Sequence, residues 1–561
     1  MKRRLFLFAA ALPLILATAA QAQQITRGPY LQQGTAHRMI VRWRTDIPTD
    51  SRVDYGLSAG DLSEREMVGT PTTEHEIVLS GLTPETRYYY AVGTGEAILA
   101  GGPDFSFVTA PLPGTPRPIR IWAIGDAGTA NDNQRAVRDA YVAFTGQRHT
   151  DLWLMLGDNA YDDGTDAQYQ AAVFEIYPAL LRTSAVWPTF GNHDSHASSA
   201  LAQRGPYFEI FTLPTRGEAG GVASGTEAYY AFDYANVHFV CLDSSETAYV
   251  PGANTTMLEW LTEDLRATDQ RWIIAFWHHP PYSKGSHDSD LDPTLAQIRH
   301  SFLPILEDAG VDLVLSGHSH SYERSFLLDG HYGNSETLDA SMILDAGNGR
   351  PEEEGSYKKP TDGIAPHEGA VYVVAGSSGK TSDGKFDHEA MYVSLEELGS
   401  LVIDVAGSVL TATFLDDHGD IRDTFTIEKG TERLTAPEGL SATFTGEAVE
   451  LTWQDRSSNE TFFKIERSRD DNRWGVIALA DADATHFVDS AVETGETYFY
   501  RIRAGSDTGN SPYSGIVTVE TGRGSPCGFV SDPRVGGSAL LLALALLLLL
   551  ATALRRRLLL P

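Results

Sequence analysis

Cysteine is nearly absent from this chain, which has only two in 561 residues. Cys241 lies within an apolar run at 237–242 that predicts a buried strand, whereas Cys527 lies close to the C-terminal end. A disulfide between them is not expected, so the chain is not a small secreted scaffold stapled by disulfides. Hydrophobic cores must stabilise it instead, and the length predicts about three domains.

Positive charge is also scarce. Lysine and arginine total 43 residues against 75 aspartates and glutamates, which gives a formal net charge of −32. No basic face is evident, and this argues against nucleic acid as the main partner. Such acidity does not attract anionic substrates, so a phosphate site would need its own local positive charge, which metal ions can supply. We interpret the acidity itself as favouring solubility.

Long apolar runs are confined to the two ends of the chain. At the N-terminal end, basic residues 2–4 precede an apolar stretch at 5–19, and a small-residue A-x-A pattern at 20–22 follows. This order is typical of a signal peptide, here residues 1–22, cut before Gln23. The stretch is too short to favour a permanent membrane span. We therefore expect an exported protein that is periplasmic, secreted or held at the cell surface.

The C-terminal end mirrors this arrangement. Residues 538–554 are uncharged and apolar, at the short limit for spanning a bilayer, and a basic tail at 555–561 follows on the expected cytoplasmic side. Gly536-Gly537 ends the preceding linker, residues 523–537. The order resembles bacterial C-terminal sorting signals, whose tail is cleaved; the glycines resemble the rhombosortase type, and Cys527 leaves a cysteine-based type open. Two interpretations stay open: a membrane anchor, or processing by a sorting protease as a partner.

Residues 24–112 and 434–522 share a pattern of short alternating strands. In the first segment, 39–45 and 74–79 alternate between apolar and polar residues, with turn residues between strands. This pattern predicts a β-sandwich. Leu82-Thr83-Pro84 followed by a tyrosine-rich strand resembles a fibronectin type III domain, and the second segment resembles that family closely. The second segment has no catalytic cluster, and we expect a spacer or adhesion module there.

Between them, residues 117–428 mix strands and helices, which predicts an α/β domain. The sequence predicts strands at 119–124, 152–156, 272–276 and 311–315, and helices at 134–144, 257–265 and 295–306. Residues 329–367, rich in Gly, Glu and Pro, are expected to form a surface insertion that shapes a substrate entrance.

Five short motifs in this central segment carry metal-binding side chains. They are Gly125-Asp126-Ala127-Gly128, Gly157-Asp158-Asn159-Ala160-Tyr161, Gly191-Asn192-His193-Asp194, Trp277-His278-His279-Pro280 and Gly317-His318-Ser319-His320. Four of them follow predicted strands, the usual place for a site in a layered α/β domain; the strand before the third is less clear. The donors suffice for two metal ions sharing one carboxylate, an arrangement used for displacement at phosphorus.

These motifs resemble those of the calcineurin-like metallophosphoesterases, and more closely those of the purple acid phosphatases, whose pattern is GDxG, GDxxY, GNH(D/E), VxxH and GHxH. The resemblance covers about residues 24–428, because that family also has an N-terminal β-sandwich. The run 317–324 matches the family beyond its minimal motif. The chain departs from the family at Ala275, where the family has valine, but the side chain at this position only packs. The implied fold is a four-layer α/β metallophosphoesterase sandwich flanked by two all-β fibronectin type III-like sandwiches.

The resemblance implies a bridging carboxylate, Asp158, and three further ligands for each ion. The first ion would take Asp126, Tyr161 and His320, and the second would take Asn192, His278 and His318. Carboxylate and phenolate suit a trivalent ion such as Fe(III), whereas imidazoles and an amide suit a divalent one, namely Zn, Mn or Fe. A hydroxide between the ions would be the nucleophile. Because His279 is adjacent to His278, the residues alone leave open which of the two histidines is the ligand.

Three further residues have catalytic roles implied by the resemblance. His193, and His287 nine residues after His278, would contact phosphate and help to protonate the leaving oxygen. Asp194 would orient His193 through a hydrogen bond. From its residues alone, the loop around His287 could equally be a solvated one.

The leading hypothesis is an exported binuclear phosphatase that hydrolyses phosphomonoesters by attack of a metal-bound hydroxide. A phosphodiesterase or nucleotide-processing enzyme is the alternative, because related two-metal sites cleave either bond. A third hypothesis is a surface adhesion protein whose phosphatase domain is incidental. Loss of a metal ligand would favour the third hypothesis, but all seven implied ligands are present.

Overall fold

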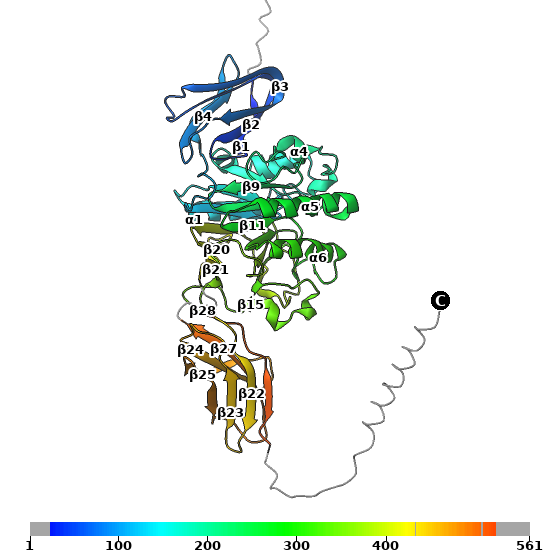
Figure 1. The fold of residues 1–561 in the computed structure, drawn as a ribbon. Coiled ribbons are helices and arrows are strands. Elements are labelled where there is room, and N and C mark those ends of the chain that lie inside the picture. Colours follow the sequence, from blue (N-terminus) through cyan, green and yellow to red (C-terminus); the bar gives the residue numbers. More distant parts are fainter. Residues whose placement is uncertain (1–22, 432–433, 507–508, 523–561) are drawn as a thin grey trace, which may run out of the picture.

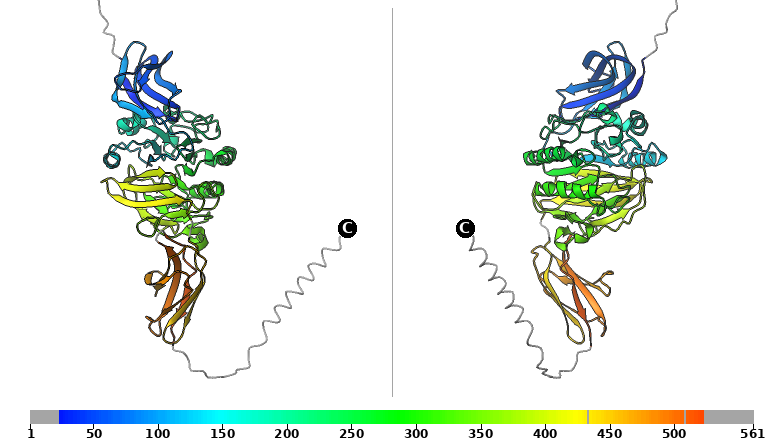
Figure 2. Two further views of the ribbon diagram at one scale, coloured as in Figure 1. Left: turned by 60° about the vertical axis from the view of Figure 1, so that its left-hand side comes forward. Right: turned by 90° about the vertical axis from the view of Figure 1, so that its right-hand side faces the viewer.

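The computed structural model describes residues 23–431, 434–506 and 509–522. The predicted signal peptide, the linker with Cys527 and Gly536-Gly537, the apolar run 538–554 and the basic tail lie outside these residues. Within the described part of the chain, no helix is both long and apolar enough to cross a membrane. Three units follow one another along the molecule: an N-terminal β unit, a central unit with helices, and a C-terminal β unit (Figures 1 and 2).

The N-terminal unit is built on two long, paired strands that run through both of its β layers. Its strands are β1 (Ile25–Gln32), β2 (Arg38–Gly56), β3 (Glu64–Ser80), β4 (Arg87–Gly93) and β5 (Ile98–Val108). The first half of β2 pairs with β1 and the second half with β4, and the register with β3 shifts between Arg44 and Thr49. The two halves enclose a core that includes Trp43, Leu79 and Phe107. The predicted all-β fold is therefore present, but its sheet is continuous.

This unit is also continuous with the central unit. Leu31 in β1 pairs in parallel with Ala185 in β8 (Ala185–Pro188), so a single 12-stranded sheet runs through both units. The guanidinium group of Arg44 adds hydrogen bonds of 2.6 and 2.7 Å to the carboxylate of Asp166, which opens the short helix α2 (Asp166–Tyr169). The N-terminal unit is thus joined to the central unit by backbone pairing and ion pairing.

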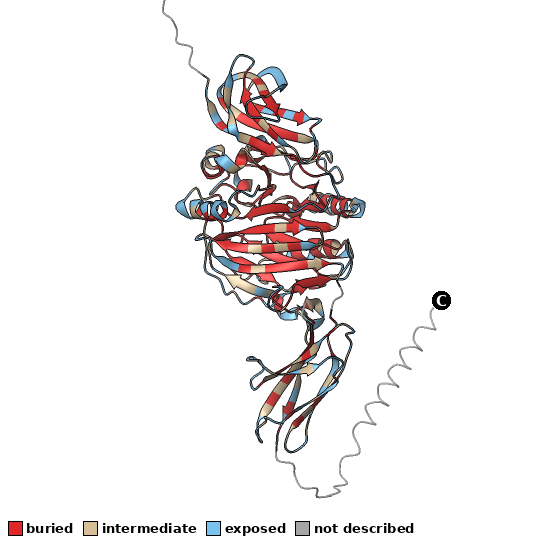
Figure 3. Cartoon of the chain, turned by 90° about the vertical axis from the view of Figure 1, so that its left-hand side faces the viewer, coloured by how far each residue is buried: buried red, intermediate tan, exposed pale blue. Residues whose placement is uncertain are grey.

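Two sheets face each other in the central unit. The first runs in the order β16-β21-β20-β19-β6-β7-β8, and the second in the order β18-β13-β17-β12-β11-β10-β9. The remaining strands of the first are β6 (Ile119–Ile124), β7 (Leu152–Met155), β16 (Tyr357–Lys359), β19 (Gly399–Ala406), β20 (Val409–Asp416) and β21 (Ile421–Lys429). Those of the second are β9 (Tyr230–Tyr234), β10 (Val237–Cys241), β11 (Trp272–Phe276), β12 (Leu313–Ser316), β13 (Tyr322–Ser325), β17 (Val371–Ala375) and β18 (Met391–Leu395). Buried residues dominate both sheets (Figure 3).

Helices cover the outer faces of this pair of sheets and complete four layers. On the first sheet, Tyr141 of α1 (Asp132–Thr145) stacks on Trp122 of β6, with ring centroids 4.3 Å apart. On the second, Phe302 of α6 (Pro293–Asp308) meets Trp277 edge-on at 5.3 Å, and α5 (Pro251–Ala267) lies beside α6. Short helices α3 (Pro178–Leu181) and α4 (Pro206–Ile210) occupy connections. The predicted strands and helices are confirmed, and so is the four-layer fold class.

The C-terminal unit is all-β. One sheet contains β22 (Glu438–Phe444), β23 (Val449–Gln454) and β26 (His486–Asp489); the other contains β24 (Phe462–Ser468), β25 (Gly475–Asp481), β27 (Thr497–Ser506), β28 (Gly509–Asn510) and β29 (Val517–Glu520). A separate core, with Trp453, Phe463 and Tyr500, fills the space between them.

The two β units share a local structure that their sequences also share. The backbone N–H of Thr83 donates to the hydroxyl of Tyr88 over 3.0 Å, and the N–H of Glu493 donates to the hydroxyl of Tyr498 over the same distance. Each is a tyrosine corner, a feature of immunoglobulin-like sandwiches. The tyrosine-rich strand of the first segment and the strand that contains Tyr498 in the second therefore play the same structural part in both units.

The expectation of a surface insertion at 329–367 is wrong at two short strands and several buried residues, although most of the segment is exposed or half-buried. It contains the short strand β15 (Ile343–Asp345), which pairs with β14 (Leu327–Leu328), and also β16, which extends the first sheet. His331, Tyr357 and Lys359 are fully buried. Parts of the segment are therefore built into the sheet and the core, whereas stretches such as 339–341, 351–353 and 360–362 are exposed.

A buried ion pair joins the two sheets. The guanidinium group of Arg324 on β13 donates to the carboxylate of Asp423 on β21 over 2.6 and 3.0 Å, and both side chains are fully buried. A buried charge that loses its partner is strongly destabilising, whereas a half-exposed pair contributes little.

We therefore expect Arg324→Met to lower the free energy of unfolding of the central unit by about 3–5 kcal/mol. The matched control is Arg422→Met, which removes a partly exposed pair with Glu397 and should cost less than about 1 kcal/mol. Chemical denaturation followed by tryptophan fluorescence measures both. Equal effects of the two substitutions would contradict the role given to the buried pair.

Candidate metal centre

The five motifs meet where strands of both sheets end. The first three follow the adjacent parallel strands β6, β7 and β8, and the last two follow β11 and β12, which are also adjacent and parallel. The sequence left the strand before Asn192 unclear, and the structure places β8 there. The predicted site residues therefore come from two facing sheets, and the motif loops converge between them.

Glycines allow these loops to approach one another. A Cβ atom on Gly157 would lie 2.4 Å from Nδ1 of His278, and one on Gly191 would lie 2.1 Å from the backbone nitrogen of Asp158. Both distances are far below van der Waals contact. The glycine that opens each of these two motifs is thus required by close packing of one ligand loop against the next.

Three of the predicted ligands adopt left-handed backbone conformations. The φ angles are +54° at Asp126, +51° at Asp158 and +66° at His318. A non-glycine residue in this region costs about 1–3 kcal/mol and persists only where the surroundings enforce it. Such strain clusters at functional sites, and here it turns each side chain sharply away from the end of its strand.

Two buried carboxylates lie at the centre. The hydroxyl of Tyr161 is 2.9 Å from Oδ1 of Asp126 and 3.0 Å from Oδ2 of Asp158, so it links the two. Burial raises the pKa of Asp126 to about 8, which means that its charge is poorly stabilised by the protein. For Asp158, burial acts in the same direction but the neighbouring His278 outweighs it, and the pKa is lowered.

Asn192 connects two imidazoles on the other side of Asp158. Its Oδ1 lies 2.9 Å from Nε2 of His278 and 3.0 Å from Nδ1 of His318. Nε2 of His278 is also 3.3 Å from Oδ1 of Asp158. Since Nδ1 of His278 lies 2.9 Å from the carbonyl oxygen of Leu156, that carbonyl fixes the ring and leaves Nε2 directed at the site.

His320 faces the other carboxylate. Its Nε2 lies 3.6 Å from Oδ1 of Asp126, and its Nδ1 lies 3.0 Å from the hydroxyl of Ser382. Burial lowers the pKa of His320 to about 3, and that of His318 well below its ordinary value. Both rings are therefore neutral at pH 7 and can present a lone pair, the form in which histidine binds metal.

The donor set fits metal ions. Against the effect of burial, Asp158 raises the pKa of His278 to about 9, so in the protein alone a proton on His278 offsets the charge of Asp158. Within the residues that the structure describes, neither Asp126 nor Asp158 forms an ion pair with lysine or arginine. Two cations would supply the missing positive charge, and the carboxylate, imidazole, amide and phenol donors could hold them.

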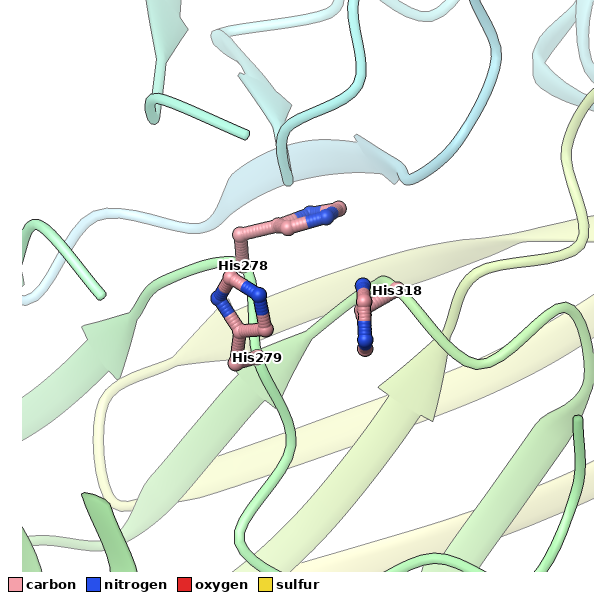
Figure 4. Close-up of side chains that lie close together, drawn as sticks. All are labelled: His278, His279 and His318. Atoms are coloured by element: carbon pink, nitrogen blue, oxygen red, sulfur yellow. The ribbon is translucent and has the colours of Figure 1, made fainter. Parts of the chain in front are cut away.

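The structure also shows which of the two adjacent histidines, His278 and His279, faces the predicted ligands. Figure 4 shows both projecting from the loop after β11, with His318 beside them. One ligand nitrogen of each of these three histidines lies within 4.8 Å of the others. Nδ1 of His279, however, is 3.0 Å from the hydroxyl of Ser244, and it is His278 whose Nε2 reaches Asp158 and Asn192. The geometry favours the position implied by the resemblance.

His193 and His287 lie at the partly exposed rim of the cluster. Nε2 of His193 is 3.9 Å from Oδ2 of Asp158, while its Nδ1 is 2.6 Å from the carbonyl oxygen of Asp162. The ring of His287 stacks on that of His318, with centroids 3.9 Å apart, and burial lowers the pKa of His287. Both therefore lie beside the predicted ligands.

The role predicted for Asp194 is wrong. Its buried carboxylate accepts hydrogen bonds from the backbone N–H groups of Asn159 and Gly191, and from the hydroxyl of Tyr169. The hydrogen-bond partner of the His193 ring is instead the carbonyl oxygen of Asp162, which accepts from Nδ1. Asp194 consequently fixes the second motif loop against the third, because its position at the turn points its side chain inward rather than towards the imidazole.

One residue at the site was missed by sequence reasoning. The ammonium group of Lys380 lies 3.6 Å from the centroid of the Tyr161 ring. Lys380 has no motif around it, but its loop follows β17, which pairs in parallel with β12. A prediction that β17 continued the sheet would have directed attention to this loop, since parallel strands end at the same edge.

Comparison with known proteins identifies two regions of the chain. The sequence profile of calcineurin-like phosphoesterases matches residues 119–322, and that of the purple acid phosphatase N-terminal domain matches residues 27–109. The chain is 28% identical to purple acid phosphatase 1 of Ipomoea batatas and 29% identical to purple acid phosphatase 23 of Arabidopsis thaliana. These matches cover 55% and 49% of this chain, and 65% of each relative. The chain thus spans somewhat less than two thirds of the curated relatives that it matches.

Solved structures agree on the fold. A purple acid phosphatase from yellow lupin seeds superposes with a TM-score of 0.55 at 17% identity, covering 72% of this chain and 75% of that one. PhoD superposes with a TM-score of 0.51 at 12% identity, covering 82% and 93%. At these identities the likeness concerns the fold alone.

Proposed function

The chain combines a calcineurin-like phosphoesterase domain with the N-terminal domain of the purple acid phosphatases, and from this premise we propose that it is a binuclear metal-dependent phosphatase acting on phosphomonoesters. One observation carries the proposal: the buried Asp158 carboxylate is contacted by the Tyr161 hydroxyl, the backbone N–H of His193 and the His278 ring, with Asp126 in the same cluster. Oδ2 of Asp158 lies 3.0 Å from the Tyr161 hydroxyl, and its Oδ1 lies 3.3 Å from Nε2 of His278. Asp158 is therefore positioned to serve both halves of the donor set.

The two halves correspond to two ion sites. Asp126, Tyr161 and His320 would hold the first ion, and Asn192, His278 and His318 the second. When bound, the pair supplies positive charge to a phosphoryl group and activates water as a nucleophile. The strained turns and the carbonyl of Leu156 hold the donors in place before any ion arrives, so little reorganisation is needed on binding.

Tyr161 favours a trivalent ion in the first site. Burial and the neighbouring Asp126 raise the pKa of its phenol well above 10. Only a strongly acidic cation would draw off the proton, which supports Fe(III) there and a divalent Zn, Mn or Fe ion in the second site.

His193 and His287 would handle protons and phosphate at the rim. Because Nδ1 of His193 is engaged by the carbonyl of Asp162, its Nε2 is the atom free to face a phosphoryl oxygen. His287 would donate a proton to the leaving oxygen. Burial places its pKa below 6.5, so the protonated form that can donate is populated in acid and is lost as the pH rises through that pKa.

The protein is proposed to act outside the cytoplasm. The observations are the signal-like residues 1–22 and the apolar run 538–554 with its basic tail, which would hold the protein at a membrane or cell surface or be removed by a sorting protease. Mass spectrometry of cell fractions tests this. Mature protein should begin near Gln23 outside the cytosol, whereas intact protein in the cytosol with Met1 retained would refute export.

Asp158→Ala tests the proposed function as a whole. We expect the wild-type protein to carry two metal ions per chain and to hydrolyse p-nitrophenyl phosphate faster than bis-p-nitrophenyl phosphate. The substitution should remove both activity and metal, because this carboxylate serves both sites. Asp139→Ala, at an exposed position on α1, is the control and should change neither. Two ions retained in Asp158→Ala would refute the assignment, and faster diester cleavage by the wild type would favour a phosphodiesterase.

A second prediction concerns His287. His287→Ala should keep both metals and lower kcat by about 10²–10³-fold towards alkyl phosphates. The loss should be smaller for p-nitrophenyl phosphate, because its leaving group needs little protonation, and smaller at alkaline pH, where His287 is already neutral in the wild type. Steady-state kinetics on both substrates across pH measures this. The same loss for both substrates would assign His287 to binding only.

A third prediction concerns Tyr161 and the identity of the first ion. Protein purified from iron-supplied cells should show a visible absorption band from phenolate-to-iron charge transfer, and Tyr161→Phe should lose it. Tyr177→Phe is a suitable control, because this buried tyrosine lies in the core, away from the predicted ligands. An active, colourless wild-type protein without iron would exclude Fe(III) while leaving the phosphatase proposal intact.

A further inference from the structure

The loop that follows β17 is fixed across the rim of the metal centre. The N–H of Ser378 donates to the carbonyl of Gly125 over 3.1 Å, and the N–H of Ser382 donates to the carbonyl of His320 over 3.2 Å. The carbonyl of Gly379 accepts from Nδ2 of Asn131 over 3.2 Å. Because these bonds flank Lys380 on both sides, the backbone at this lysine is held in place beside the predicted ligands.

The side chain of Lys380 lies on the face of Tyr161. Its ammonium nitrogen is 3.6 Å from the ring centroid, a cation–π distance, whereas the phenol hydroxyl points away from it to Asp126 and Asp158. The same ring also contacts the ring of His193 in a T-shaped arrangement, with centroids 4.6 Å apart. Lys380 therefore lies beside the predicted ion sites without being one of their donors.

Two other lysines, one of them in the same loop as Lys380, are paired with carboxylates. Lys284 forms an ion pair with Asp290 at 3.2 Å, and Lys385 with Asp288 at 2.8 Å. For Lys380, no such pair exists among residues 23–431, 434–506 and 509–522. In a chain with a net charge of −32, a half-buried ammonium group that lies on an aromatic face and has no ion pair within the described residues is available to bind an anion.

We propose that Lys380 forms an anion subsite that binds a second anionic group of the substrate, such as a second phosphate or a carboxylate. This inference rests on the proposed function. The phosphoryl group that reacts would lie at the seven metal donors, on the hydroxyl side of Tyr161. The ammonium group of Lys380 lies over the Tyr161 ring, and so to one side of the reacting group. The favoured substrates are then phosphomonoesters that carry another negative charge a short distance from the ester.

Binding of phosphonates, which are not hydrolysed, tests the subsite without requiring turnover. The probes are propane-1,3-diyl bisphosphonate and propylphosphonate, titrated calorimetrically into the purified full-length protein. We expect the wild type to bind the bisphosphonate at least about tenfold more tightly, the advantage expected of one hydrogen bond to a charged group. Lys380→Gln should lose this advantage, and Lys380→Arg should retain it.

The control is Lys385→Gln, which removes a lysine from the same loop but one that is already paired with Asp288. It should retain the advantage, and the metal content of every variant should equal that of the wild type. An equal preference for both probes in the wild type, or the same preference in Lys380→Gln, would overturn the subsite. Failure of the phosphatase proposal would instead appear as absent hydrolysis of p-nitrophenyl phosphate, which is measured separately.

Discussion

The constraint on which the rest of the structure depends is the burial of two carboxylates, Asp126 and Asp158, at neighbouring strand ends. Burying such charges is costly unless opposite charge is brought to them. Histidines, not lysines or arginines, are the basic groups within 4 Å of either carboxylate in the described parts of the chain. Both carboxylates therefore lack a permanent positive partner, and the pKa values of Asp126 and His278 are raised as a result. A pair of cations resolves it, and the surrounding fold holds the donors ready for them.

The layered fold is what allows both halves of the donor set to meet. Parallel strands of one sheet bring the two carboxylates, Tyr161 and Asn192 to one edge, and the facing sheet brings His278, His318 and His320. Neither sheet alone has enough donors. The ion pair between Arg324 and Asp423 joins the two sheets, so the site depends on contacts far from the donors themselves.

The β units attach to this centre in different ways. The N-terminal unit shares a sheet with the central unit through β1 and β8, so the third motif, which follows β8, is connected to it by backbone pairing. The C-terminal unit has its own core and meets the central unit through polar contacts, such as the 2.8 Å pair between Arg503 and Glu354. This difference is consistent with a structural role for the first unit and a more independent role for the second.

The sequence alone determined the residue types, the strands before four motifs and the three-unit organisation, because glycine, apolar runs and metal-binding side chains are local features. It could not determine which atom of each donor faces which, since that depends on loops up to about two hundred residues apart. Asp194, which was expected to form a hydrogen bond with His193, instead holds two motif loops together. Lys380, which belongs to no motif, lies on the face of Tyr161. Both positions follow from how the strand ends pack, and only the tertiary structure decides that packing.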